Sequence, residues 1–541
     1  MRTHRLAWAF AALTLGVTTP AAATPGPDSV AVVANANVPE SVALAQTYAA
    51  ARDVPDAQVC LLDLPTEEDI SLDDYETMFL EPLRACLDAT PTVRERIESI
   101  LLIRGVPMRV QVPFMGRTEA IGLAAALGLW DSADSLGIPI LRQEAGTLAP
   151  CGGGNMCFAA RWANPYRGFP FESGWTLDRD GIVWKPVLVT MLHARSYEDA
   201  EGLLDSALAA ESMAPPTGEM LFMDGADPAR GALDGQYPVV INNLTALGFT
   251  ANRVPFDSDL TGHTLMSFAT GTASLGMTIE GNTFLPGSVV DNLTSFGAVP
   301  ANFREDGTEQ QVSIARWVER GVAGVHGTVA EPLNNCFPGR IFVTSYASGA
   351  TLAEAYHTAL PYVFWMNLVL GDPMAAPYAI RPTLSVSGID EGASLAGATS
   401  ITVDATDAES RGIESVAMFV DGVEVARAMS GSLTHCLDAD PGEHQLLIVA
   451  RVAEDASGVS IWKPKGWVAY SFTAAAGAST CATPMGDGGV SADGGVSSTD
   501  AGPGAMTGDG CGCRVTTAPG GRPIALALIG IALGLRRRRS R

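Results

Sequence analysis

The residues best suited to chemistry occur one at a time, each where a buried apolar run gives way to a polar loop. They are Arg104, His193, Asp224, Thr270, His326 and Glu331. In open α/β sheets ligands bind beyond the carboxyl ends of the strands, so these side chains form one candidate site. The histidines would serve as general base and the carboxylates as their partners, while Arg104 and Thr270 would bind the ligand. The same residues could instead only cap strands and turns, because every strand must end in something polar.

A second candidate arrangement pairs Cys336 with His326, which precedes it in the same loop. A cysteine nucleophile needs a base within hydrogen-bond reach, and the histidine would supply it. In an oxidising compartment the alternative is a disulfide or an inert thiol. A hydrolase therefore requires that Cys336, both histidines and Glu331 meet in one pocket.

Common cofactor and metal motifs are missing from the sequence. It has no HExxH motif, no Walker loop and no glycine fingerprint for dinucleotides, and Ser295 and Ser313 lie in no Gly-x-Ser-x-Gly context. The seven histidines, at 4, 193, 263, 326, 357, 435 and 444, have no metal-ligand spacing. We therefore predict that the protein uses no cofactor and no metal ion.

The composition is that of a large, acidic globular chain. The 541 residues are 47% hydrophobic and carry a net charge of −25, and lysine occurs only at 185, 463 and 465. With no basic stripe to neutralise phosphates, nucleic acid is not an expected partner. The acidity favours solubility outside the cell.

The first part of the chain alternates apolar runs with helical patterns, which indicates βαβ units around a parallel sheet. Strands are predicted at 30–34, 58–62, 99–103, 187–192, 220–223, 250–254, 264–269 and 322–325. Helices are predicted at 39–52, 73–88, 93–98, 196–211, 237–247, 309–320, 351–358 and 360–370. The segment 139–174 is predicted to be a long surface excursion. We expect residues 24–381 to form one open, mostly parallel α/β domain flanked by helices.

The pattern changes to period two near residue 380. Short alternating runs fill 382–474, and Asp421-Gly422 between two of them favours a hairpin with a primed turn. We predict a small all-β sandwich there, similar to the immunoglobulin-like modules of bacterial surface proteins. Residues 475–510, rich in Gly, Ser, Ala, Thr and Asp, are predicted to be a flexible linker.

Both ends of the chain resemble export signals. Residues 1–23 have a basic start, an apolar stretch and a small-residue cleavage site, as in a secretory signal peptide. The apolar run 524–535 near the other end would span about 18 Å as a helix, too short for a hydrocarbon core of about 30 Å, although a single-pass anchor is the alternative. Four arginines, 536–539, follow it.

The tail 511–541 resembles the MYXO-CTERM sorting tail of myxobacterial secreted proteins, with Cys511 and Cys513 before the apolar run and the arginines after it. The resemblance implies cleavage by a sorting protease, lipid attachment at Cys511 or else Cys513, and display at the outer surface. The membrane would then be reached through the processed tail.

Seven further cysteines would lie in an oxidising compartment, which permits disulfides. Cys151 could pair with Cys157 across a glycine-rich loop, and Cys60 with Cys86. Cys336, Cys436 and Cys481 remain, so at least one of the seven is left over.

Several segments resemble an uncharacterised family of secreted bacterial proteins common in myxobacteria. They are 30–37 (VAVVANAN) with Ser41, 51–55 (ARDVP), 103–107 (IRGVP), 327–332 (GTVAEP), 352–356 (LAEAY) and 371–373 (GDP). More remotely, the strand order resembles gingipain-like cysteine peptidases, which implies a caspase-like fold. Their catalytic His-Gly would fall near Thr270-Gly271 and their cysteine near Thr294-Ser295, where this chain has neither residue.

Two hypotheses follow. The chain is a surface-displayed binding module for envelope, matrix or another protein, without catalysis or as a degenerate peptidase relative. Alternatively it is a surface hydrolase that uses a strand-end His/Glu or His/Cys site.

Overall fold

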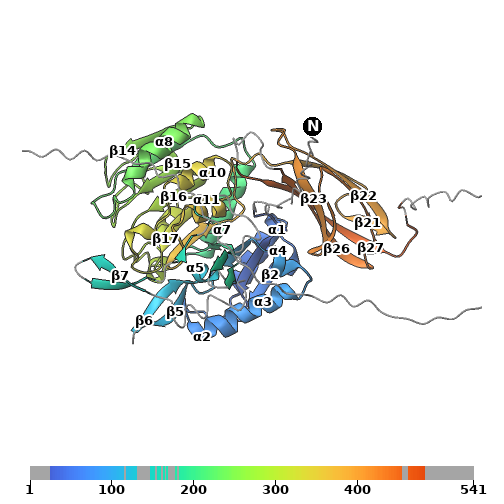
Figure 1. Ribbon diagram of the computed structural model, residues 1–541, viewed down its shortest axis with the longest axis horizontal. Helices are drawn as coiled ribbons and strands as arrows, with labels where there is room; N and C mark the ends of the chain where they lie inside the picture. Colours follow the sequence, from blue (N-terminus) through green and yellow to red (C-terminus); the bar gives the residue numbers. More distant parts are fainter. Residues whose placement is uncertain are drawn as a thin grey trace, which may run out of the picture. The chain divides into compact units, whose positions relative to one another are not determined.

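The computed structural model describes residues 25–114, 117–128, 130, 147–152, 155–159, 162–164, 166–168, 177–179, 182–184, 186–453, 461–479 and 481 (Figure 1). The signal peptide predicted at 1–23, almost all of the linker 475–510, and the tail with Cys511 and Cys513 lie outside the described residues. So does most of the excursion predicted at 139–174. No helix in the described ranges has the length and apolarity needed to cross a membrane.

A ten-stranded sheet organises the first part of the chain. Its order is β14-β13-β15-β16-β17-β19-β12-β4-β1-β2. The strands are β1 (Val30–Asn35), β2 (Val59–Leu62), β4 (Ser99–Ile103), β12 (Leu188–Leu192), β13 (Glu219–Met223), β14 (Ala251–Val254), β15 (Thr264–Thr270), β16 (Thr283–Asn292), β17 (Gly324–Thr328) and β19 (Asn367–Gly371). Neighbours run parallel from β14 to β17 and again from β12 to β2, whereas β19 runs antiparallel to β17. The predicted mostly parallel α/β sheet is confirmed.

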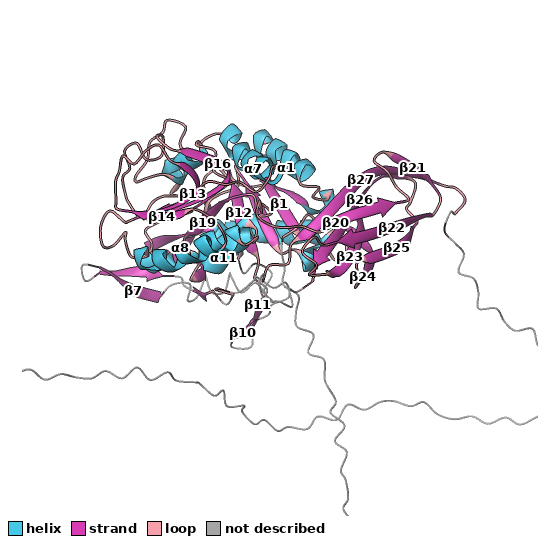
Figure 2. Cartoon of the chain, turned by 90° about the horizontal axis from the view of Figure 1, so that it is seen from above, coloured by secondary structure: helices cyan, strands magenta, loops and turns pink. Residues whose placement is uncertain are grey.

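Helices cover both faces of this sheet. Figure 2 shows α1 and α7 over one face and α8 and α11 over the other. Burial on both faces explains why the central strands read as unbroken apolar runs, such as the fully buried β1. The principal helices are α1 (Pro39–Ala51), α3 (Glu81–Asp88), α7 (Tyr197–Glu211), α8 (Tyr237–Ala246), α9 (Ile314–Val318), α10 (Ile341–Ala347) and α11 (Leu352–Ala359).

Local signals set the helix starts. Ser196 accepts a hydrogen bond from the backbone of Asp199 and begins α7. Thr351 and Glu354 form a reciprocal capping box that begins α11. The helix predicted at 73–88 is a continuous run of α2 (Leu72–Asp74), a π-helical segment (η2, Tyr75–Leu80) and α3.

The contacts of the strand ends place the carboxyl ends of both parallel groups at one edge of the sheet. Arg109, shortly after β4, donates from Nη1 to the carbonyl of Val329, just after β17, at 3.4 Å. His193, directly after β12, packs its ring on Phe303, in the segment that follows β16. This edge is where the candidate residues lie.

Three element predictions are wrong or incomplete. The helix predicted at 360–370 is instead β18 (Tyr362–Phe364) and β19. A short apolar run is ambiguous by periodicity, and ladder pairing with β17 decides it here. The helix predicted at 309–320 is only α9, because Ser313 caps it at 314. The strand β16 was not predicted at all.

Four smaller sheets accompany the large one among the described residues of the α/β part. One has the order β3-β5-β6, with β3 (Asp69–Ser71), β5 (Arg109–Phe114) and β6 (Arg117–Gly122). Others are β7 (Thr147–Gly152) with β8 (Asn155–Ala159), β10 (Leu177–Arg179) with β11 (Ile182–Trp184), and β9 (Trp162–Ala163) with β18. Three strands, β7, β8 and β9, therefore fall within the excursion 139–174, for which no strand was predicted.

The C-terminal β region, β20 to β27, is antiparallel in most of its pairings. Two sheets, β20-β22-β25 and β21-β27-β26-β23-β24, share a core that includes Ile401, Met418, Ile448 and Phe472. The strands are β20 (Thr383–Ser387), β21 (Ala393–Ala396), β22 (Thr399–Thr406), β23 (Ile413–Val420), β24 (Val423–Ala428), β25 (Ser432–Leu437), β26 (Gly442–Val452) and β27 (Lys465–Ala475). Asp421 and Gly422, with φ of 49° and 80°, make the predicted turn between β23 and β24.

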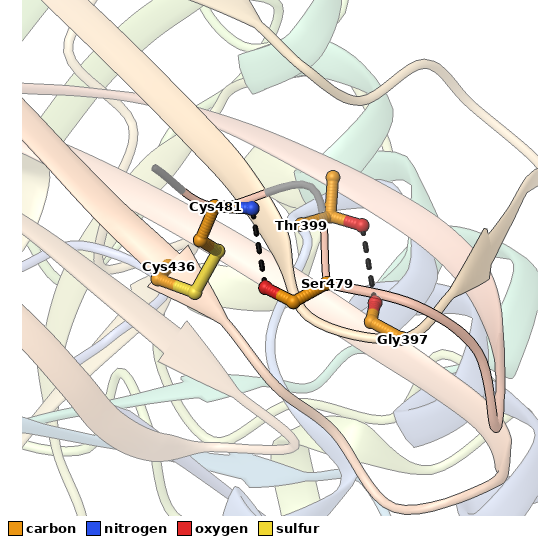
Figure 3. The surroundings of a disulfide bond; sticks show 5 residues. All are labelled: Gly397, Thr399, Cys436, Ser479 and Cys481. Carbon is orange, nitrogen blue, oxygen red and sulfur yellow. Dashed lines mark hydrogen bonds between the residues drawn. A yellow bond between two sulfur atoms is a disulfide. The ribbon is translucent and has the colours of Figure 1, made fainter. Parts of the chain in front are cut away.

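Two disulfides are present among the described residues. Cys60–Cys86 joins β2 to α3, as one of the predicted pairings. Cys436–Cys481 ties β25 to the chain beyond β27, next to a turn in which Thr399 donates to the carbonyl of Gly397 (Figure 3). Cys336 is the free, buried cysteine of the described chain. The side chains of Cys151 and Cys157 lie outside the described residues.

Candidate functional site

His326 lies at the centre of a buried polar network. Its side chain is fully buried in β17. Nδ1 is 2.8 Å from Asp291 Oδ1 in β16, and Nε2 is 2.9 Å from Asn367 Oδ1 in β19. The imidazole is therefore held from both neighbouring strands, with the ring of Phe337 packed edge-on at 5.4 Å.

Arg340, just before α10, supplies the countercharge of this network. Its Nη1 donates to Asp291 Oδ2, and its Nη2 donates to the carbonyl of Thr270 at 3.0 Å. Burial by itself would raise the pKa of Asp291, but Arg340 and the hydrogen bond from His326 outweigh it and hold that pKa below the usual value. The pKa of Arg340 is raised despite its burial, chiefly by Asp291. Asp291 and Arg340 thus form a fully buried ion pair.

Cys336 touches the same network. Its Sγ is 3.4 Å from Asn367 Oδ1, the oxygen that also faces His326 Nε2. Burial first, and then the charge of Asp291, raise the pKa of the thiol far above its usual value. Cys336 therefore stays a neutral thiol at physiological pH, unlike an activated nucleophile.

Glu331 lies elsewhere, on the surface. Its carboxylate accepts from Ser295 Oγ at 2.8 Å, and the backbone N–H of Ser295 donates to Gln311. Thr294, beside Ser295, donates to the same Gln311 oxygen. Glu331 thus caps the loop after β16, in an exposed position quite unlike that of His326.

Arg104 and His193 end the neighbouring strands β4 and β12, and the structure adds Glu68 to them. Nε2 of His193 is 3.9 Å from Glu68 Oε1, and the ring is fully buried against Phe303. Within the described residues, neither ring nitrogen has a hydrogen-bond partner in good geometry, and the nearby carbonyl of Ala194 accepts from Arg104. The pKa of His193 is well below its usual value, first through burial and then through Arg104.

The carboxyl group of Glu68, beside Arg104 and His193, is an unusually weak acid. Burial raises the pKa of its carboxyl to about 7, and Arg104 only partly opposes the shift. The side chain is nevertheless 42% exposed, so solvent screens part of this effect. Arg104 lies 5.2 Å above the ring of Tyr197.

The last two predicted residues serve local structure. Asp224, after β13, pairs with Arg253 of β14 at 2.6 Å in a partly exposed position. Thr270 is fully buried, and its Oγ1 reaches the carbonyl of Asp224 at 3.4 Å. The carbonyl oxygen of Thr270 also accepts a hydrogen bond from Arg340.

The predicted site therefore divides into four local groups. Cys336 and His326 share Asn367, Arg104 and His193 share Glu68, while Asp224 and Glu331 each have a separate partner. Sequence reasoning missed Asp291, Arg340, Asn367 and Glu68. Asp291 follows the apolar pair Val289-Val290, a signal that could have identified both β16 and its carboxylate. Among the described residues no three His, Cys, Asp or Glu side chains are grouped so as to hold a metal ion.

Comparisons with known proteins find only weak likenesses. No family model matches the chain, and no curated protein matches it. The fibronectin(III)-like modules of a Clostridium thermocellum protein are 16% identical with a TM-score of 0.15, over 21% of this chain and 53% of theirs. The endo-beta-1,4-mannanase from Thermotoga petrophila is 9% identical with a TM-score of 0.14, over 48% of each chain. The matches thus span about half of each of these solved chains, and such scores carry no argument about fold or activity.

Proposed function

We propose that the protein is exported, displayed at the cell surface and acts as a binding module, without His/Cys hydrolysis. The observation that argues against His/Cys hydrolysis is the buried network around His326, while the signals predicted at both ends of the chain support export and display. The imidazole that would be the base faces Asp291 and Asn367, and the thiol that would be the nucleophile is buried and neutral. Side chains committed in this way stabilise the core instead of meeting a substrate.

The strand ends support a degenerate relationship to caspase-like peptidases. Thr270-Gly271 directly ends β15, and Thr294-Ser295 follows β16, its neighbour in the sheet. These are the positions where gingipain-like peptidases would carry their histidine and cysteine. Threonine and serine stand there in place of the histidine and cysteine of the peptidase dyad, and Ser295 donates to the carboxylate of Glu331 and not to an imidazole.

A second candidate function rests on Glu68. A carboxyl with a pKa of about 7, whose Oε1 lies 3.9 Å from Nε2 of His193, has the acidity of a general acid or base at neutral pH. A hydrolase on this scaffold would therefore use Glu68, directly before β3, and His193, directly after β12, and not Cys336.

A thiol-labelling experiment tests the main proposal. The exported chain is treated with a small thiol-reactive probe, first folded and then in urea, and Cys336 is followed by mass spectrometry. We expect no labelling of Cys336 in the folded protein and full labelling in urea, which controls for reagent quality. A peptide library incubated with the folded protein should stay uncut.

Rapid labelling of Cys336 in the folded protein, lost in a His326→Phe variant that remains folded, would overturn the proposal. Cleavage of peptides that persists in a Cys336→Ala variant but disappears in Glu68→Gln would favour the second candidate.

A further inference from the structure

A buried cluster of charges joins the C-terminal β region to the opposite, amino-terminal edge of the large sheet. Lys465, the first residue of β27, is 3% exposed, and its Nζ lies 3.1 Å from both carboxylate oxygens of Asp28. The same amine is 3.1 Å from Ser29 Oγ and from Glu98 Oε2. Asp28 and Ser29 precede β1 and Glu98 precedes β4, so a single lysine of the β region meets two strand starts of the α/β part.

The charges of this cluster balance only when both parts are present. Arg451 of β26 lies 3.6 Å from Glu98 Oε1, and Arg96 donates to the carbonyl of Asp28 at 2.6 Å. Burial alone would raise the pKa of Asp28, but Lys465 outweighs it and lowers that pKa. A buried ammonium or carboxylate without its partner is strongly destabilising, so neither part can bury its share of the cluster by itself.

Further contacts surround the cluster. Trp467 donates from Nε1 to Asp53, at the end of α1, at 3.0 Å, and Arg381 lies 4.7 Å above its indole ring. Arg96 donates to the carbonyl of Gly422 in the β23–β24 turn. Trp462, just before β27, is 5% exposed and packs in the same apolar cluster as Phe342 of α10.

We propose that the Lys465 cluster is a latch that locks the C-terminal β region onto the α/β part, so that the described chain moves as one rigid body. The segment 372–382 between β19 and β20 is then a connection and not a hinge. A partner bound to the β region would hold the α/β part in a fixed orientation. The latch would hold the two parts together whether or not the protein binds a partner.

Cutting the connection tests the latch. A protease recognition site is inserted between Ile380 and Arg381 of the full chain, where Ile380 is 44% exposed. The two described disulfides each lie on one side of the cut, so they cannot hold the fragments together. After cleavage the fragments should elute together in gel filtration at micromolar concentration.

Substitution of Lys465 should weaken the association of the two cleaved fragments. Lys465→Met leaves Asp28 and Glu98 without their shared countercharge, and we expect fragment affinity to fall at least about 100-fold. Lys463→Met is the matched control, because Lys463 pairs with Glu414 of the β region itself, at 3.9 Å, and its loss should leave affinity unchanged. Separation of the wild-type fragments, or equal affinities for the two variants, would overturn the latch. The cleaved wild-type chain decides the question even if Lys465→Met does not fold.

Discussion

The buried pair of Asp291 and Arg340 allows a prediction whose magnitude follows from the structure. Asp291→Asn keeps the shape of the side chain and its acceptor oxygen but removes the charge. Arg340, fully buried, is then left without its countercharge. Removing one partner of such a pair costs about 3–5 kcal/mol. Arg340 cannot escape by losing its proton, because its pKa is raised even in the wild type and a guanidinium stays protonated at neutral pH. We therefore expect a loss of about 3–5 kcal/mol that hardly changes between pH 6 and 8.

The reverse substitution should behave differently. In Arg340→Met, Asp291 keeps its hydrogen bond to His326 at 2.8 Å but loses its countercharge. Because Arg340 holds the pKa of Asp291 below its usual value, that pKa should rise in the variant, and the buried carboxyl can take up a proton as the pH falls. The lost hydrogen bond to Thr270 adds about 1 kcal/mol. The deficit should therefore be smaller than in Asp291→Asn at low pH and grow as the pH rises.

The free energy of unfolding of both variants is measured by urea unfolding. Hydrogen exchange in peptides covering β16 and β17 then reports the stability of the α/β part separately from that of the C-terminal β region. The double variant, which has neither charge, should recover part of the loss. A loss below about 1 kcal/mol in Asp291→Asn, or the same pH dependence in both single variants, would refute the buried-pair reasoning.

Three further predictions concern other sites. Burial raises the pKa of Glu68 to about 7, so its ionisation weakens the fold as the pH rises from about 4.5 to 7. Glu68→Gln should therefore be more stable than the wild type at pH 8 but not at pH 4, as measured by urea midpoints. Because solvent screens this partly exposed group, the gain should be on the order of 1 kcal/mol. Replacing Cys436 and Cys481 by serine opens a closure of 45 residues and should cost the C-terminal β region up to about 4 kcal/mol, with faster hydrogen exchange in β25 and unchanged exchange in β12. Serine at both Cys511 and Cys513 should abolish lipid labelling of the exported protein, and undiminished labelling would contradict the sorting signal.

Much of the fold was accessible from sequence because its signals are local. The run Val30–Ala34 is apolar at every position, as a strand covered on both faces must be. Asp421-Gly422 tolerates the positive φ of a tight turn, and Thr351 with Glu354 forms a cap within a single helical turn. Each of these features depends only on residues that are close together in the chain, so each can be recognised from the sequence.

The candidate site could be predicted only in part. The sequence predicted that polar residues follow the strands, but it did not show which strands lie side by side. The ladder places β17 between β16 and β19, and this pairing brings Asp291 and Asn367 to His326. Periodicity alone also predicted a helix at 360–370, whereas pairing with β17 makes the end of this segment part of strand β19.

What the sequence by itself determined is the parallel α/β architecture, the β-rich C-terminal part and the pairing option Cys60–Cys86. What only the tertiary structure decided is which polar groups are buried together. Lys465 reaches Asp28 from 437 residues away, and Arg340 reaches Asp291 from 49. The physical reason is that burying a charge is favourable only beside its partner, and the partner's position depends on the packing of the whole chain.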